Sequence, residues 1–256
     1  MKTFFTIVIA FCLAFPVMSQ NGLPSATVDS SFHIYLLMGQ SNMAGRGKVN
    51  EEEKVNPQVL VLNKEKQWVI AKDPLHFDKP NIVGVGPGLS FGKAMVEPGI
   101  KIGLIPCAVG GTSIQLWKPG AFDDRTNTHP WDDAIVRIEE GMRYGVVKGV
   151  IWHQGESDSS PEKAVNYLVD LNDLIKRIRT LVGNETLPFV AGELGQYKEL
   201  YQNINRELEK LPASIVHTGL ARSQDLTAKE DGVHFNTASA QEFGKRYAAV
   251  MKELID

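Results

Sequence analysis

The alternation of short apolar runs with longer segments of helical periodicity constrains the fold most strongly. The apolar runs predict strands at residues 33–38, 59–62, 102–107, 146–152, 187–191 and 215–216. Helical spacing covers residues 89–96, 131–144, 161–181, 197–211 and 237–254. Strands that are apolar throughout need cover on both faces, and strands that alternate with helices usually join in parallel. The pattern therefore predicts an α/β protein with a parallel sheet covered on both faces.

Size and composition suit a single soluble domain. The chain has 256 residues, of which 43% are hydrophobic and 22% charged. No repeat, low-complexity tract or Pro/Ser-rich linker follows residue 30, so we expect one domain over residues 30–256. The net charge is −3, which gives no attraction for phosphate backbones and argues against a nucleic-acid partner.

The N-terminus has the pattern of a secretory signal peptide. Lys2 precedes an apolar run over residues 3–17, and Ser19 provides a small residue at the cleavage spacing. The run is short for a membrane span, so we expect a signal peptide over residues 1–19, a secreted or periplasmic protein, and no membrane association after cleavage. Cleavage removes Cys12 and leaves Cys107, so the mature chain can form no internal disulfide.

Polar or glycine-rich segments follow three of the predicted strands. These segments are residues 39–45, 109–113 and 153–158. Open α/β sheets bind ligands beyond the carboxyl ends of their strands, so the three segments should meet at one edge of the sheet. A fourth candidate, residues 231–234, precedes the last predicted helix.

These segments contain the groups that acyl transfer requires. Ser41 follows the first strand, and its hydroxyl becomes a good nucleophile when a base takes its proton. His234 is the natural base, and Asp231, three residues earlier, can hold the other ring nitrogen and fix the tautomer. We therefore predict that Ser41, His234 and Asp231 form the catalytic centre.

Acyl transfer also needs hydrogen-bond donors for the oxyanion of its intermediate. The backbone N–H of Ser41, an N–H of the turn at Gly110 and Gly111, and the side-chain amide of Gln154 are the candidates. Glycine suits the turn because the backbone must approach the substrate closely. Further candidates for contacts with the substrate are Gln40, Asn42, His153 and Trp117.

Other readings of the same segments are weaker. Met43 stands where the α/β-hydrolase elbow has its final glycine, and the glycines of residues 84–88 lack dinucleotide-binding spacing. No His, Cys or Asp cluster has convincing metal-ligand spacing, so we expect neither metal nor cofactor. Taken singly, a serine after a strand is usually a helix cap; the coincidence of polar segments at successive strand ends favours catalysis.

The same segments resemble the conserved blocks of SGNH-type hydrolases. They are most similar to the carbohydrate-esterase branch with acetylxylan esterases and the sialate O-acetylesterase domain. The resemblance is carried by residues 39–43, 108–114, 152–158 and 231–235, in the family's order along the chain. It implies a three-layer αβα sandwich with a flavodoxin-like parallel sheet, and metal-free hydrolysis of an ester.

The resemblance also implies roles for individual residues. Ser41 would be the nucleophile and His234 its base, with Gly110 or Gly111 and Gln154 in the oxyanion hole. Glu156 matches a glutamate of this branch and could share or replace the role of Asp231; the local spacing to His234 favours Asp231.

The leading hypothesis is a carbohydrate O-deacetylase acting on acetylated xylan or O-acetylated sialic acid. The sugar and the oligomeric state stay open. A lipid or thioester hydrolase on the same scaffold and a non-catalytic glycan-binding protein are the alternatives. The loops expected to select the glycan are residues 64–86, predicted as an irregular excursion, and residues 118–130.

Overall fold

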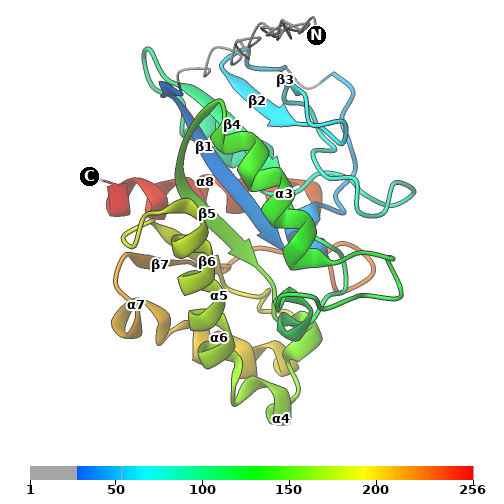
Figure 1. The fold of residues 1–256 in the computed structure, drawn as a ribbon. Helices are drawn as coiled ribbons and strands as arrows, with labels where there is room; N and C mark the ends of the chain where they lie inside the picture. Colours follow the sequence, from blue (N-terminus) through cyan, green and yellow to red (C-terminus); the bar gives the residue numbers. More distant parts are fainter. Residues whose placement is uncertain (1–27, 53, 256) are drawn as a thin grey trace, which may run out of the picture.

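A seven-stranded sheet forms the centre of the computed structural model, which describes residues 28–52 and 54–255 (Figure 1). The strand order is β3-β2-β4-β1-β5-β6-β7, and all neighbours are parallel except the antiparallel pair β2 and β3. The strands are β1 Asp29–Gly39, β2 Val59–Leu62, β3 Trp68–Ile70, β4 Lys101–Pro106, β5 Gly145–His153, β6 Phe189–Gly192 and β7 Thr218–Ala221. The predicted signal peptide lies outside the described residues.

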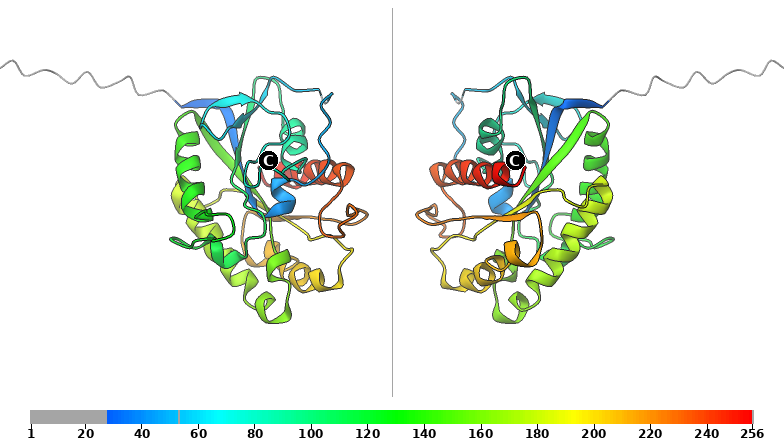
Figure 2. Two further views of the ribbon diagram at one scale, coloured as in Figure 1. Left: turned by 90° about the vertical axis from the view of Figure 1, so that its right-hand side faces the viewer. Right: turned by 90° about the vertical axis from the view of Figure 1, so that its left-hand side faces the viewer.

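Helices cover both faces of the sheet, so the predicted three-layer sandwich is confirmed (Figure 2). The α-helices are α1 Ser41–Ala44, α2 Gly88–Ala94, α3 Pro130–Met142, α4 Pro161–Ala164, α5 Tyr167–Val182, α6 Gln202–Leu208, α7 Leu211–Ser214 and α8 Thr237–Ile255. Short 3₁₀ turns are η1 Ile114–Trp117, η2 Glu156–Asp158 and η3 Glu199–Tyr201. Helices α3 and α5 lie on one side of the sheet, and α2 and α8 lie on the other.

The central strand β1 supplies both cores by simple alternation. Its side chains Ile34 and Leu36 pack into the core beneath α3 and α5, whereas Tyr35 and Leu37 pack into the core beneath α2 and α8. All four side chains are buried. Successive residues of a strand point to opposite faces, so one strand contributes side chains to both cores. A strand that is apolar on both faces can occupy only the middle of such a sandwich.

The strand order determines where a ligand can bind. With the β2–β3 hairpin set aside, β4-β1-β5-β6-β7 is the flavodoxin-like order, in which the second strand in sequence lies beside the first and the others follow on the far side. The order reverses between β1 and β5, where Gly39 pairs with His153 at the carboxyl end. The segments after these two strands therefore flank the crevice where such sheets bind ligands.

Three details differ from the sequence-based expectation. The stretch 64–86 is not wholly irregular: a tight turn with Lys66 at φ 60° returns the chain as β3. The last strand is 218–221 rather than 215–216, because Val216 is exposed and α7 occupies the preceding residues. The predicted helix over 161–181 is broken near Asn166 into α4 and α5.

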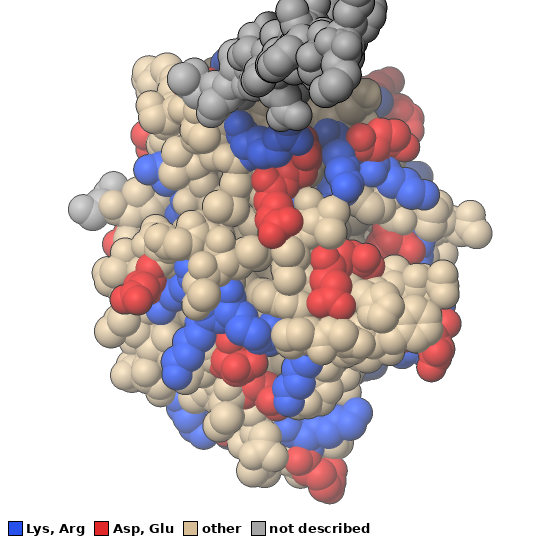
Figure 3. Space-filling model, in the orientation of Figure 1, with Lys and Arg blue, Asp and Glu red and all other residues tan. Residues whose placement is uncertain are grey.

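The surface over α3 and α5 carries both signs of charge. Figure 3 shows Lys and Arg interspersed with Asp and Glu on this face, as expected from the small net charge. Within the described ranges, no helix is long and apolar enough to cross a membrane. Cys107 is a free, buried thiol.

Candidate active site

Ser41, His234 and Asp231 form a continuous hydrogen-bonded chain. The Ser41 hydroxyl lies 3.0 Å from His234 Nε2, and His234 Nδ1 lies 2.9 Å from Asp231 Oδ2. With the Nδ1–H tautomer, His234 donates to Asp231 and its Nε2 is free to accept the serine proton. The structure thus brings together three predicted residues from opposite ends of the chain, in the geometry of a nucleophile, a base and an orienting carboxylate.

The end of β1 determines where Ser41 points. Gly39 has φ 127°, a conformation that L side chains rarely adopt, and a Cβ there would lie 2.1 Å from the backbone oxygen of His153. The next residue, Gln40, donates its N–H to the same oxygen at 2.8 Å. Ser41 then opens the short helix α1 with its side chain toward His234. Only glycine allows β1 to turn this closely over the end of β5.

The Asp231 carboxylate is held within its own turn. Its Oδ1 accepts the backbone N–H groups of Val233 and His234, each at 2.9 Å, and Gly232, which follows Asp231, has φ 62°. Burial opposes ionisation, but these N–H groups and the His234 ring outweigh it and lower the pKa of Asp231 well below its usual value. Asp231 is therefore a carboxylate whenever His234 works as a base.

Asn42 ties the serine segment to the histidine segment. Its amide donates to the carbonyl oxygen of Val233 at 3.3 Å, and its Oδ1 accepts the N–H of Phe235 at 3.0 Å. These contacts lie on either side of His234, and Asn42 itself follows Ser41. The predicted substrate contact by Asn42 is corrected: the side chain is buried and its polar atoms bond within the protein.

Glu156 supports Asn42 rather than His234. Its Oε1 accepts the Asn42 amide at 2.6 Å and lies 3.5 Å from His153 Nε2. Burial tends to raise the pKa of Glu156, but the His153 ring and the Asn42 amide outweigh it and lower the pKa. Among the described residues, only Asp231 bonds the His234 ring as a carboxylate, so the geometry favours Asp231 of the two predicted candidates.

Two of the predicted oxyanion donors are engaged elsewhere. The Gly110 N–H donates to Asp78 Oδ2 at 2.8 Å. Gln154 is fully buried, and its amide faces Asp158 Oδ2 at 2.6 Å and the Thr112 carbonyl at 3.1 Å. These contacts turn both groups away from an oxyanion at Ser41.

The other two predicted donors are free. Within residues 28–52 and 54–255, no hydrogen-bond acceptor is found for the backbone N–H of Ser41 or Gly111. Both residues line the cavity above the serine, and Gly111 adopts φ 85°. Two unpaired N–H groups in the wall of one cavity are available to stabilise an oxyanion.

A buried ion pair missed by the sequence analysis supports the glycine turn. Arg46 Nη2 lies 2.9 Å from Asp78 Oδ2, the atom that also accepts the Gly110 N–H. Both side chains are at most 4% exposed. Arg46 directly follows the serine segment, so its place in the chain could have indicated it. Asp78 lies in an irregular stretch without any motif and offered no such signal.

Two predicted substrate contacts are wrong. Trp117 is fully buried in the core beneath α3 and α5, where its indole N–H donates to the Thr112 hydroxyl at 3.2 Å. His153 is also fully buried, with Nδ1 3.2 Å from the Tyr247 hydroxyl. Neither side chain presents surface to a ligand, whereas Gln40 does line the cavity at Ser41.

The cavity at Ser41 has a volume of about 370 Å³ and a mixed lining. Its walls come from the ends of β1 and β5, the glycine turn and the histidine turn; they consist of Gln40, Ser41, Arg46, Lys79, Ile82, Gly110, Gly111, Glu156, Ser157, Tyr201, Val233 and His234. In the described part of the chain, no group of three or more His, Cys, Asp or Glu side chains could hold a metal ion.

Fold and site define a class, the carboxylic ester hydrolases of SGNH type. Residues 31–253 match the family described as carbohydrate esterase, sialic acid-specific acetylesterase, and the chain belongs to that family. A probable carbohydrate esterase of Arabidopsis thaliana is 30% identical over 234 residues, which cover 82% of this chain and 86% of that protein.

Solved structures show the same fold. An Arabidopsis thaliana protein superposes with a TM-score of 0.78 at 28% identity, over 88% of this chain and 99% of that chain. A carbohydrate acetylesterase from Xanthomonas citri gives a TM-score of 0.68 at 21% identity, over 87% of this chain and 56% of that chain. NanS gives a TM-score of 0.68 at 14% identity, over 88% of this chain and 98% of that chain.

Proposed function

We propose that the protein is a serine esterase that removes O-acetyl groups from a carbohydrate through an acetyl-enzyme on Ser41. The observation that carries the proposal is the chain from Ser41 Oγ through His234 to Asp231, with contacts of 3.0 and 2.9 Å. The membership in a carbohydrate esterase family supports the substrate class.

In the first half of the reaction, His234 Nε2 takes the proton of Ser41 Oγ as that oxygen bonds to the acetyl carbonyl carbon. The carbonyl oxygen becomes an oxyanion, which the N–H groups of Ser41 and Gly111 stabilise. When the intermediate collapses, the bond from the carbonyl carbon to the sugar oxygen breaks and His234 returns the proton to that oxygen. The sugar leaves, and the acetyl group stays on Ser41.

In the second half, water replaces the sugar. His234 takes a proton from the water as its oxygen bonds to the acetyl carbonyl carbon, and the new oxyanion uses the same two N–H groups. Collapse breaks the bond to Ser41 Oγ, which recovers its proton from His234, and acetate is released. Asp231 stays ionised throughout and stabilises the imidazolium formed in each half.

Acetate release from 4-nitrophenyl acetate and from acetylated sugars tests the proposal. Ser41→Ala should lower kcat by at least about 10⁴-fold, because loss of one member of such a unit removes most of its effect. Ser214→Ala, at the exposed end of α7, is the control and should retain most activity. Equal acetate release by wild type and Ser41→Ala would contradict the assignment of the nucleophile.

Chain-length and substrate panels separate the alternatives. A lipid or thioester hydrolase would prefer octanoyl to acetyl esters, whereas the proposed deacetylase should prefer the acetyl ester. Glycan binding without acetate release would favour a non-catalytic role. Acetylated xylan and O-acetylated sialosides, compared side by side, distinguish the two proposed carbohydrate classes.

We also propose that the protein is exported, that residues 1–19 act as a signal peptide, and that residues 30–256 form one esterase domain. The apolar run before Ser19 supports the export proposal. Expression of the full sequence in a bacterial host, followed by N-terminal sequencing of the exported protein, tests it. A mature protein that begins at Met1 would contradict cleavage.

A further inference from the structure

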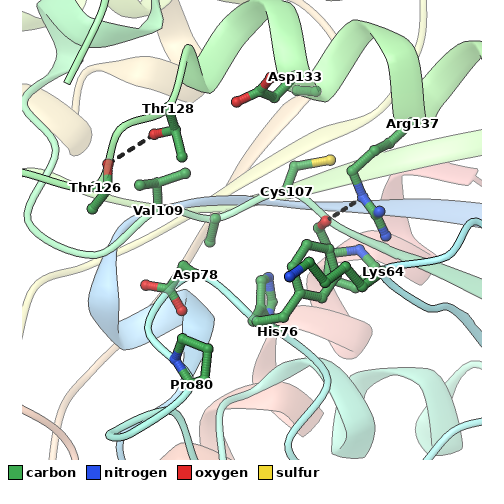
Figure 4. Close-up of a pocket in the computed structure, with 14 residues that line it drawn as sticks. Lys64, His76, Asp78, Pro80, Cys107, Val109, Thr126, Thr128, Asp133 and Arg137 are labelled. Carbon is green, nitrogen blue, oxygen red and sulfur yellow. Dashed lines mark hydrogen bonds between the residues drawn. The ribbon is translucent and has the colours of Figure 1, made fainter. Parts of the chain in front are cut away.

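A second cavity lies beside the one that contains Ser41. It has a volume of about 350 Å³ and lies at the carboxyl ends of β2 and β4, beneath the first half of α3 (Figure 4). Residues 64–80 and 126–128 form much of its wall. These belong to the two loops that the sequence predicted to select the glycan, so two separate excursions of the chain converge on one pocket.

The two cavities share a thin wall. Asp78 and Val109 line the second cavity, and the next residues along the chain, Lys79 and Gly110, line the cavity at Ser41. The wall is fixed by the bond from the Gly110 N–H to Asp78 at 2.8 Å. The second cavity therefore adjoins the place where an acetyl group would meet Ser41.

Hydrogen-bond accounting shows unused acceptors around the second cavity. The Thr126 hydroxyl donates its single hydrogen to Asp123 at 3.0 Å. In the 2.8 Å contact between Thr126 and Thr128, the Thr128 hydroxyl is therefore the donor. Thr128 Oγ1 then keeps a lone pair for a ligand. Asp78 Oδ1 is buried with no hydrogen-bond partner within the described residues, and Asp133 uses one oxygen on the His129 N–H.

The charges around the second cavity balance. Asp78 and Asp133 supply two carboxylates, and Lys64 and Arg137 supply two cations. Figure 4 shows Thr126, Thr128 and Asp78 on one side of the space and Lys64 and Arg137 on the other. Arg137 is buried, donates to the carbonyl oxygens of Pro106, Asn63 and Leu62, and lies 4.6 Å from the centre of the Phe77 ring. This environment attracts neither a lone cation nor a lone anion strongly, but a neutral polyol can both donate and accept here.

We propose that this second cavity is a subsite for a second sugar residue, linked to the one that carries the acetyl group. The inference rests on the proposed esterase function and deepens it: the substrate is an oligosaccharide or a polysaccharide rather than a free monosaccharide. Hydroxyl groups of the second sugar donate to Thr128 Oγ1 and to Asp133, and the Lys64 ammonium donates to another hydroxyl oxygen.

The test compares kcat/KM on three kinds of substrate. These are 4-nitrophenyl acetate, acetylated monosaccharides (xylose and free sialic acid) and the matching acetylated oligosaccharides (xylotriose and sialyllactose). Thr128→Val and Lys64→Met each remove one polar contact, and Thr128→Trp fills the cavity. Thr186→Val, on an exposed loop at the amino end of β6 and therefore away from the carboxyl ends of the strands, is the matched control.

Wild type should prefer one oligosaccharide over its monosaccharide by about tenfold or more. Thr128→Val and Lys64→Met should each lower kcat/KM on that oligosaccharide by roughly three- to tenfold, mainly through KM, since each loses about one hydrogen bond. Thr128→Trp should abolish the preference, and 4-nitrophenyl acetate should be hydrolysed equally by all variants.

Two results would overturn the subsite. One is equal kcat/KM of wild type on both oligosaccharides and their monosaccharides; the other is an unchanged preference in Thr128→Trp. If 4-nitrophenyl acetate is hydrolysed in either case, the subsite alone is wrong. If wild type hydrolyses none of the three kinds of substrate, the esterase proposal fails and the subsite fails with it.

Discussion

Single residues near His234 show how surroundings assign different tasks to two carboxylates. Asp231 faces the histidine ring and is held by backbone N–H groups in a partly exposed turn. Glu156 is almost buried and holds Asn42. The two groups have the same chemistry, so their contacts alone decide which one orients the base.

Replacing Asp231 by Asn should therefore be far more damaging than the equivalent change at Glu156. An amide at Asp231 donates to His234 Nδ1 and favours the wrong tautomer, so kcat should fall by about 10³- to 10⁴-fold. Glu156→Gln should cost less than about 10²-fold, because the Asn42 contact can persist. Steady-state kinetics on 4-nitrophenyl acetate, with Glu230→Gln as control, measure both effects, and a reversed order would contradict the assignment.

Asn42→Ala should lower kcat with little change in KM. The substitution removes the contacts on both sides of His234 and leaves Glu156 without its amide partner, so the distance from Ser41 to His234 is no longer fixed. We expect a loss of about 10- to 100-fold in kcat and about 1–3 kcal/mol in stability. If kcat stays at the wild-type value while the melting temperature falls, Asn42 has only a structural role.

The residues of the candidate site could be predicted from sequence where they lie in a recognisable motif. Ser41, His234 and Asp231 lie in segments whose order along the chain indicated chemistry, and the structure brings them into contact. The burial of Trp117 could not be predicted, because the direction of a side chain depends on the path of η1 across the core. The bond from Asp78 to Gly110 spans 32 positions between irregular segments, and no local pattern encodes it.

At the scale of elements, the close approach of the end of β1 to the end of β5 positions Ser41. Short apolar runs separated by helical segments were sufficient to predict most of the sheet, because a parallel strand buried on both faces must be apolar throughout. Strand β3 was missed because its apolar run, Trp68–Ile70, is only three residues long. The break between α4 and α5 was missed because no glycine or proline marks it.

Gly39→Ala should disrupt this close approach. A methyl group at 2.1 Å from the His153 oxygen forces β1 and β5 apart, and we expect a loss of more than about 3 kcal/mol in stability together with activity. Gly99→Ala is a matched control, since Gly99 also has positive φ (79°) but no atom within 4 Å of the added carbon. It should cost only about 1 kcal/mol. Thermal melts of both variants test this; equal losses would mean that backbone strain, not the clash, dominates.

At the scale of the whole molecule, stability should depend on pH through His76. This side chain is buried, and burial lowers the pKa of His76 to about 4, although the Asp78 carboxylate opposes the shift. The Leu37 carbonyl also opposes the shift, while Arg137 and Arg46 add to it. The unfolded chain therefore binds a proton between pH 6.5 and about 4 that the folded chain does not.

The folded state should lose stability as the pH falls from 6.5 towards 4, and the loss should be smaller in His76→Gln. Melting temperatures at pH 7, 6, 5 and 4 for wild type, His76→Gln and the exposed-site control His129→Gln measure this. His129→Gln should follow the wild-type curve. Parallel curves for wild type and His76→Gln would show that His76 titrates alike in the folded and unfolded states.

The distance along the chain between Ser41 and His234 affects when the enzyme can first act. The two residues are 193 positions apart, and α8, which follows His234, packs beside α2 on the same face of the sheet. Until the ribosome has passed residue 234 of 256, the proposed nucleophile has been synthesised but its proposed base has not. Ester hydrolysis that needs both residues can therefore begin only when synthesis is nearly finished.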